Sequence, residues 1–116
     1  PKEKAEGVAE ISFDDFAKVE LLTAKILECK PIKKSKKLLK IQADDGSGEK
    51  RQIVSGISQW YTPEDLIGKT VVIVSNLKPA KLCGEMSNGM LLAGDTADGG
   101  VKVLFVDGME PGTRLR

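Results

Sequence analysis

Short β-type segments separated by turn residues recur along this chain, and their order limits the folds open to it. Six segments are rich in β-branched and other apolar residues: 21–28, 38–44, 51–57, 70–76, 90–94 and 102–106. A helix is expected after the third, because Thr62 can cap it, Pro63 suits its first position, Glu64 and Asp65 favour its N-terminus and Gly68 can end it. The sequence therefore predicts an all-β chain with one short helix between its third and fourth strands.

Three strands, a helix and two further strands follow the order of the oligonucleotide-binding (OB) fold. We therefore expect a five-stranded OB-fold barrel with a short helix between strands 3 and 4, plus C-terminal extra strands. Barrels of this kind bind oligomers mainly through strands 2 and 3 and through the loops that join strands 1 to 2 and 4 to 5. If the chain is a binding barrel, its ligand chemistry should concentrate in those two loops.

The N-terminal residues 1–10 alternate Lys, Glu, Ala and Gly without apolar periodicity, which is typical of a linker. Ser12 and Asp15 have the spacing of a capping box. Phe13 and Phe16 lie three residues apart, so a short helical turn is expected to direct both rings toward the core. We expect a linker over 1–10, left from a longer protein, and a single domain over 11–116.

Catalytic and metal-binding functions are disfavoured by the residue inventory. Histidine is absent, so the chain lacks the commonest general base and the imidazole metal ligand. Cys29 and Cys83 form no CxxC motif, and the residues before them show no signal-peptide pattern, so a disulfide framework or zinc site is not expected. No apolar run approaches the roughly 18 residues that a membrane span needs. We expect a cytoplasmic domain with no catalytic residue, metal or cofactor.

Lysines gather at the first of the two expected binding loops, although the net charge is only +1. Residues 29–43 contain six lysines and no acid, and Arg51 opens the third strand. A solvated turn is the alternative explanation, but the position of the cluster favours contact with phosphate. The residues of this region that we expect to contact the ligand are Lys33, Lys34, Lys36, Lys37, Lys40 and Arg51.

The second expected loop, 76–90, carries two lysines, two amide side chains and a hydroxyl, which suit phosphate and sugar oxygens. Turn capping is an alternative role for Asn76 and Ser87, and core filling is one for Met86 and Met90. The five aromatic residues lie outside both loops and outside strands 2 and 3, so no platform for stacking single-stranded bases is expected. A folded RNA, recognised through its backbone and 2′-hydroxyl geometry, fits this inventory better.

Six stretches of the sequence resemble a known family: ISFDDFAKVEL at 11–21, KLL at 37–39, QIVSGI at 52–57, PEDLIG at 63–68, NLKPAK at 76–81 and SNGM at 87–90. They are similar to the tRNA-binding domain at the C-terminus of bacterial methionyl-tRNA synthetases, which is shared by free-standing tRNA-binding proteins and by cytokine-like domains of eukaryotic synthetase complexes. The resemblance implies an OB fold and tRNA recognition by shape. It places in the tRNA-facing loop Asn76, Lys78, Lys81, Ser87 and Met90. The sequence departs from the family pattern at Leu22, Ala80 and Cys83.

The expected function is non-catalytic binding of tRNA, as a domain appended to a methionine-tRNA ligase whose separate catalytic domain is a further partner. A secretion-associated chaperone that binds unfolded peptides shares the implied fold and remains the alternative. A single-stranded DNA binder is disfavoured by the missing aromatic residues.

A homodimer is implied by the resemblance and is also expected from the C-terminal residues. Residues 95–116 follow the fifth barrel strand, and alternation makes both faces of the strand at 101–106 apolar. A strand outside a closed barrel buries only one face on it, so the other is expected to meet a second copy. The interface is predicted at Val103, Leu104, Phe105 and Val106.

Overall fold

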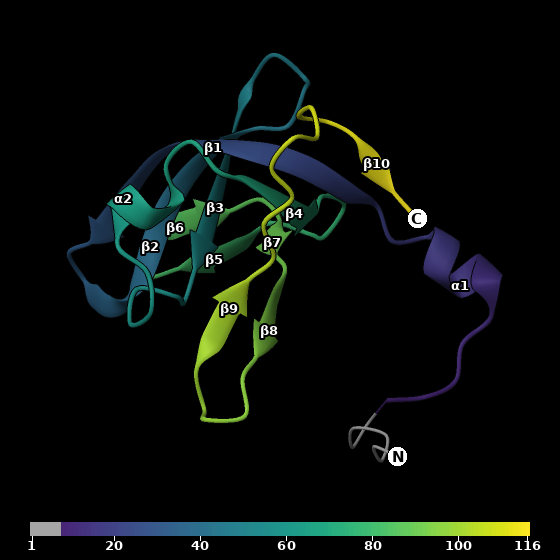
Figure 1. The fold of residues 1–116 in the computed structure, drawn as a ribbon, viewed down its shortest axis with the longest axis horizontal. Coiled ribbons are helices and arrows are strands. Elements are labelled where there is room, and N and C mark those ends of the chain that lie inside the picture. The colour runs from purple at the N-terminus through teal and green to yellow at the C-terminus, as the bar shows by residue number, and fades with distance from the viewer. Residues whose placement is uncertain (1–7) are drawn as a thin grey trace.

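The computed structural model describes residues 8–116 and shows a mostly β protein with two short helices (Figure 1). The helices are α1 (Phe13–Ala17) and α2 (Pro63–Leu66). The longer strands are β1 (Leu21–Ile32), β2 (Ser35–Asp44), β3 (Lys50–Ser55) and β4 (Thr70–Val74). The shorter strands are β5 (Ala80–Leu82), β6 (Glu85–Ser87), β7 (Met90–Leu91), β8 (Ala93–Asp95), β9 (Val101–Val103) and β10 (Arg114–Leu115).

The main sheet is antiparallel and runs in the order β3-β2-β1-β4-β7, with β10 added on β1. Strand β1 pairs with β4 through residues 21–25 and with β2 through residues 25–32, with register shifts in the second pairing between Ile26 and Glu28 and between Pro31 and Ile32. The N–H of Asn88, just before β7, donates to the carbonyl of Gln52 in β3 at 2.8 Å. This bond connects the two ends of the strand order.

The core lies between the inward faces of these strands. Along β2 the buried Leu39, Ile41 and Ala43 alternate with half-buried residues, as expected for a strand with one face on the core. Leu66 of α2 is fully buried in the same cluster. Burying a leucine side chain of this kind contributes about 1.5–3 kcal/mol.

The capping box expected at Ser12 and the cap expected at Thr62 are both present, and Thr62 also forms a capping box, with Asp65. The Ser12 and Thr62 hydroxyls each accept a hydrogen bond from the backbone N–H three residues on. The carboxylates of Asp15 and Asp65 accept in turn from the backbone N–H of Ser12 and Thr62. Helix α1 does not direct its aromatic rings toward the core, however, and this expectation is wrong. The helix lies beside the end of β1 and away from the sheet (Figure 1), and Phe13 is 76% exposed.

The segment after residue 94 is part of the fold and pairs with the main sheet. The expected strand at 90–94 divides into β7, which pairs with β4, and β8, which pairs with β9 in a projecting hairpin. Phe105 forms a β-bridge with Val71, and β10 pairs with Leu21 and Leu22 of β1. None of the helices within residues 8–116 is long and apolar enough to cross a membrane.

Candidate nucleic-acid interface

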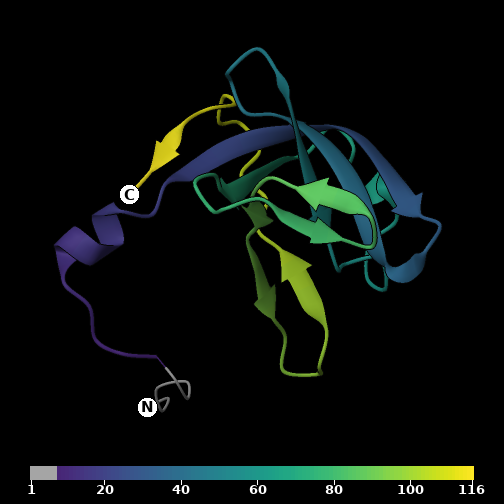
Figure 2. The ribbon, with the colours of Figure 1, turned by 180° about the vertical axis from the view of Figure 1, so that it is seen from behind.

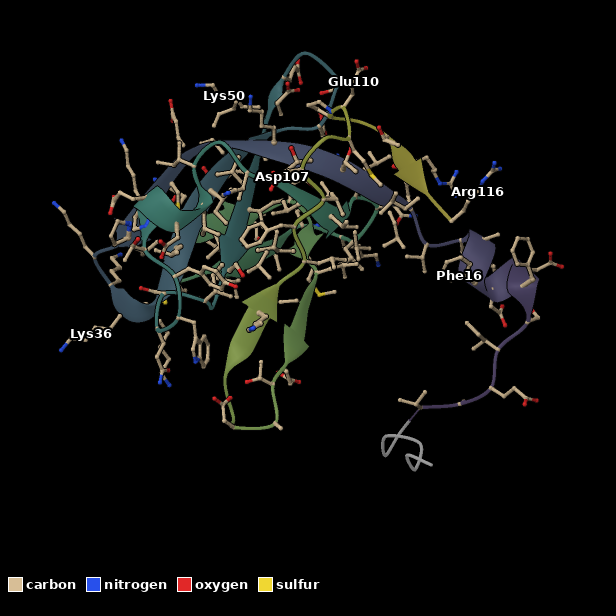
Figure 3. The ribbon with its side chains drawn as sticks, viewed as in Figure 1. Phe16, Lys36, Lys50, Asp107, Glu110 and Arg116 are labelled. Atoms are coloured by element: carbon tan, nitrogen blue, oxygen red, sulfur yellow. The ribbon has the colours of Figure 1, made fainter. Side chains whose placement is uncertain are left out.

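The lysines of the first expected loop project from a tight hairpin between β1 and β2. Strand β2 begins at Ser35, earlier than the expected residue 38, so only Lys33 and Lys34 occupy the turn. Lys36 and Lys37 lie on the strand itself and are exposed. Figure 3 shows Lys36 pointing away from the protein at the far edge of the sheet. Charges on a hairpin are held in place more firmly than charges on a long loop.

The second expected loop is largely a β-hairpin, formed by β5 and β6, that lies across the sheet (Figure 2). Its inner side is fixed to β3 by two bonds. The Gln52 amide donates to the Met86 carbonyl at 2.8 Å, and the Ser87 hydroxyl accepts from the Val54 N–H at 2.9 Å. On the outer side Lys81 pairs directly with Met86, which is about half exposed.

The turn of this hairpin contains only Cys83 and Gly84, because Leu82 pairs with Glu85. Both turn residues have positive φ, 49° for Cys83 and 83° for Gly84. This is the pattern of a type I′ turn, whose twist matches that of the two strands it joins. A side chain added at Gly84 would place its Cβ 3.8 Å from the Lys34 ammonium, so the two hairpin turns lie next to each other.

A cavity of about 350 Å³ lies between the two hairpin turns. Its walls include three of the predicted binding lysines and one carboxylate: Pro31, Ile32, Lys33, Lys34, Lys40, Cys83, Gly84 and Glu85. Segments far apart in the sequence therefore meet at one positively charged surface. Clustered ammonium groups raise the local concentration of anions and suit contact with phosphate.

Arg51 has internal partners. Its Nε donates to Asp45 at 2.8 Å, and its Nη1 donates to the carbonyls of Ser75 and Asn88 at 3.0 and 2.9 Å. The Arg51 side chain is only 16% exposed. Burial of the Asp45 carboxyl would raise its pKa, but hydrogen bonds from Ser47 and Arg51 outweigh burial and hold that pKa below its usual value. Arg51 thus connects β3 to the segments on either side of the second loop.

Asn76 and Ser87 also make structural hydrogen bonds. The Asn76 side chain accepts from the Glu20 N–H at 2.9 Å and donates to the Lys18 carbonyl at 2.6 Å. Ser87 is buried, and its hydroxyl also donates to the Gly89 carbonyl at 3.1 Å. Ser87 therefore makes the local turn bond that was weighed for it, whereas Asn76 bonds a distant segment and does not cap its own turn.

The remaining predicted residues of the second loop are exposed. Lys78 lies between β4 and β5, and Lys81 lies on β5. Met90 is 48% exposed, so it does not fill the core. Sequence reasoning missed Glu85, whose Oε1 lies 3.6 Å from the Lys40 Nζ. Glu85 is the only acidic residue between residues 76 and 90, and this could have marked it in the sequence as a partner for a nearby lysine.

The residues predicted to form a dimer interface do not share one free surface. Val103 is buried in the core of its own chain, and Phe105 packs edge-on against Tyr61 with ring centroids 6.0 Å apart. Val106 is half buried and Leu104 is 48% exposed. Because the C-terminal segment folds onto the sheet, the inward face of the strand is already covered. Val103 therefore offers little surface to a second copy, and the interface at Leu104, Phe105 and Val106 stays a prediction.

A different apolar surface lies at the other end of the chain. Phe13 and Phe16 of α1 and the following Val19 are all exposed, and they line a cavity of about 240 Å³ with Ala17 and the C-terminal residues Arg114, Leu115 and Arg116. Figure 3 shows Phe16 and Arg116 on the same side of the protein, far from Lys36. The apolar and the lysine-rich surfaces are therefore separate.

Comparison with known proteins identifies relatives of the chain. It is 52% identical over 115 residues to the methionine-tRNA ligase of Halalkalibacterium halodurans and 51% identical over 115 residues to that of Bacillus subtilis. These alignments cover 99% and 98% of this chain, but the chain spans only 17% of the length of either ligase.

Solved structures share the fold. A MetRS-related protein from Pyrococcus horikoshii aligns with a TM-score of 0.87 and 37% identity, over 94% of this chain and all of that chain. The chaperone CsaA from Bacillus anthracis aligns with a TM-score of 0.82 and 28% identity, over 93% of this chain and all of that chain. The family model described as "Putative tRNA binding domain" matches residues 21–114. The chain belongs to this tRNA-binding domain family, as its motifs indicate.

Proposed function

We propose that the chain binds tRNA without catalysing a reaction, through a surface formed where the β1–β2 turn meets the β5–β6 hairpin. The observation that carries this proposal is the cavity lined by Lys33, Lys34 and Lys40, which brings both expected binding segments together. The family match supports tRNA as the ligand. Phosphate contacts from lysines position an RNA without reading its sequence, so recognition by shape is expected.

The architecture fits an OB barrel. The strand order β3-β2-β1-β4-β7 corresponds to five barrel strands, and α2 lies between the third and fourth of them. The Asn88–Gln52 backbone bond lies where such a barrel closes. In that fold the binding face is built from strands 2 and 3 and the loops beside them, which is where the lysines lie.

The proposed contacts divide into two groups. Exposed or half-exposed side chains face the RNA: Lys33, Lys34, Lys36, Lys37, Lys40, Lys78, Lys81 and Met90. Arg51, Asn76 and Ser87 contribute indirectly, because their hydrogen bonds hold the second loop against the sheet. Fixed charges lose less entropy on binding than mobile charges.

In a full-length protein we propose that residues 1–10 are a linker and that 11–116 form a domain appended to a methionine-tRNA ligase. The identity to such ligases over a small fraction of their length supports this arrangement. Tethering makes the second contact with the tRNA intramolecular, which can raise overall avidity by roughly 10² to 10⁴. The domain would thus help the catalytic part to capture tRNA.

The test is a filter-binding titration of tRNA at several salt concentrations. With about four to six phosphates contacted, log K against log salt should have a slope of roughly −0.7 to −0.9 per contact. Lys36→Glu with Lys37→Glu should weaken binding of every tRNA alike. The matched control is Lys69→Glu with Lys102→Glu, because both lysines are exposed and lie outside β2, β3 and the β1–β2 and β5–β6 hairpins. Undiminished affinity in the first double variant would exclude the β1–β2 hairpin from the site.

Peptide binding is the second candidate, supported by the structural likeness to the chaperone CsaA and by the exposed apolar surface at α1. A chemically unfolded protein should then bind the chain, and Phe13→Glu should abolish that binding while tRNA binding persists. Binding of tRNA alone would leave the first proposal as the function of the chain.

Where α1 binds no peptide, we propose that its surface joins two copies of the chain in a homodimer, together with the adjacent C-terminal residues. Phe13 and Phe16 bury little surface within their own chain, and β10 offers a strand beside them. A symmetric pair would cover the same apolar surface on both copies. Because the lysine-rich surface lies elsewhere, both copies would keep it free for RNA.

A further inference from the structure

The cavity between the two hairpin turns contains one group of the wrong sign for an RNA-binding site. Its three lysines face a single carboxylate, that of Glu85. Within residues 8–116, Lys33 and Lys34 make no ion pair, whereas the Lys40 Nζ lies 3.6 Å from the Glu85 Oε1. Glu85 therefore neutralises one of the three positive charges that line this surface.

The strand pairing directs Glu85 toward Lys40. Side chains two residues apart on a strand share a face, and Ser87 of the same strand points inward to bond β3. Glu85 therefore points toward the sheet, where Lys40 lies on the outer face of β2. Met86, which lies between Glu85 and Ser87 on the strand, points outward beside Lys81. The position of Glu85 thus follows from the hairpin and does not depend on a flexible loop.

The ion pair is easily separated. The two side chains are 31% and 36% exposed, and 3.6 Å is longer than a hydrogen bond between charged groups. Pairs of this kind are screened by solvent and contribute little to stability. A phosphate oxygen can replace the carboxylate as the partner of Lys40, because both are anionic oxygen acceptors.

We propose that this cavity receives one backbone phosphate of the RNA and that Glu85 competes with that phosphate for Lys40. The inference rests on the proposed function and adds a residue that lowers the affinity of the site. Lys33 and Lys34 attract the phosphate, while release of Lys40 from Glu85 opposes its binding. A neutral isostere at position 85 would leave all three ammonium groups free for the RNA.

Glu85→Gln tests the proposal in the filter-binding assay, with salt varied from about 50 to 300 mM. Loss of one exposed ion pair corresponds to at most about fivefold in affinity, so we expect roughly two- to fivefold tighter binding at low salt. The gain should shrink as salt rises, because salt screens the Lys40–Glu85 pair. The slope of log K against log salt should change by less than one phosphate contact, because the same phosphate is bound in both proteins.

The matched control is Glu110→Gln, which changes the net charge equally. Glu110 is exposed, its side chain makes no hydrogen bond or ion pair within residues 8–116, and Figure 3 shows it far from Lys36. Its substitution should change neither affinity nor slope. Equal effects of the two substitutions would mean that only net charge matters and would overturn the proposal.

Lys40→Met in both backgrounds completes the test. The gain from Glu85→Gln should disappear when Lys40 is absent, because no ammonium is then released. A gain that persists without Lys40 would overturn the proposal while tRNA binding itself stands. If the parent binds tRNA without salt dependence, and the variants of Lys36 and Lys37 bind as tightly, the proposed function fails instead.

Discussion

At the scale of single residues, Cys83 occupies a backbone conformation that cysteine adopts with difficulty. Within residues 8–116 it is the only residue other than glycine with positive φ. The left-handed region is costly for residues with a Cβ, and asparagine tolerates it best in a type I′ turn. The hairpin that carries Lys81 and Glu85 therefore forms although the backbone conformation of Cys83 in its turn is unfavourable.

Cys83→Asn is expected to raise the Tm by about 2–5 °C, because the turn is less strained with asparagine at this position. Cys83→Val is the control and should lower it, since a β-branched side chain fits positive φ worst. Thermal unfolding by circular dichroism measures both. The same Tm for all three proteins would mean that this turn does not form in solution.

Arg51 shows how a residue with the chemistry of an RNA contact can become structural. Its three hydrogen bonds all end on oxygens of its own chain. Arg51→Met leaves the Asp45 carboxylate and two carbonyls without these donors, so we expect a loss of about 2 kcal/mol in the free energy of unfolding at pH 7. Lys50→Met, at an exposed neighbour, should cost less than about 0.5 kcal/mol.

The effect of Arg51→Met should depend on pH. Because the Asp45 pKa is lowered in the folded protein, the stability that its pairing contributes is present above the unfolded pKa of about 3.9. It is lost as the pH falls through the lower folded pKa. Urea denaturation should therefore show the difference between parent and variant shrinking below about pH 4. A difference independent of pH would mean that the ion pair contributes nothing.

At the scale of elements, the C-terminal segment is held to β1 by one buried hydroxyl. Thr23 donates to the Glu110 carbonyl at 2.6 Å and accepts from the Thr113 N–H at 2.9 Å. Its backbone adds bonds to Gly112 and Thr113. The short strand β10 follows directly, so Thr23 helps to place β10 beside α1.

Thr23→Val should lower the free energy of unfolding by about 1 kcal/mol, because the Thr113 N–H loses its acceptor and the Glu110 carbonyl keeps only the Thr113 hydroxyl as a donor, while side-chain volume is kept. Amide hydrogen exchange should show faster exchange at the Thr113 N–H. Thr113→Val, at an exposed position, is the control and should have a smaller effect. Unchanged exchange at Thr113 would show that the backbone bonds alone hold the segment.

At the scale of the whole molecule, two surfaces face away from each other. One carries the lysine cavity and the other the apolar residues of α1 (Figure 3). An apolar surface left open on a monomer is a site of association. Dimerisation at α1 and RNA binding at the two hairpins are therefore compatible in one assembly.

Phe13→Glu should convert the proposed dimer to a monomer with little change in the Tm, because Phe13 is exposed within its own chain. Leu104→Glu should leave the dimer intact, since Leu104 lies outside the α1 surface. Light scattering at micromolar concentration measures both masses. A monomeric parent would contradict the dimer. If only the Leu104 variant is monomeric, the interface lies at the C-terminal strand and not at α1.

The sequence by itself determined the mostly β class, the position of α2, the Ser12–Asp15 capping box, the Thr62 cap and the family. These features depend on residues close together in the chain: apolar alternation along a strand, or a hydroxyl three residues from a carboxylate. The family motifs are likewise read directly from local stretches. Strand ends were predicted less well, because pairing with a distant partner decides where a strand stops.

Only the tertiary structure decided which polar residues remain available. Arg51 meets Ser75 and Asn88, and Lys40 meets Glu85, across sequence separations that no local pattern encodes. The same holds for burial: Val103 is covered and Phe13 is exposed because of where the C-terminal segment and α1 pack. A side chain's chemistry is local, but its partners are set by the fold. The sequence could therefore predict a candidate surface, while its individual contacts could not be predicted.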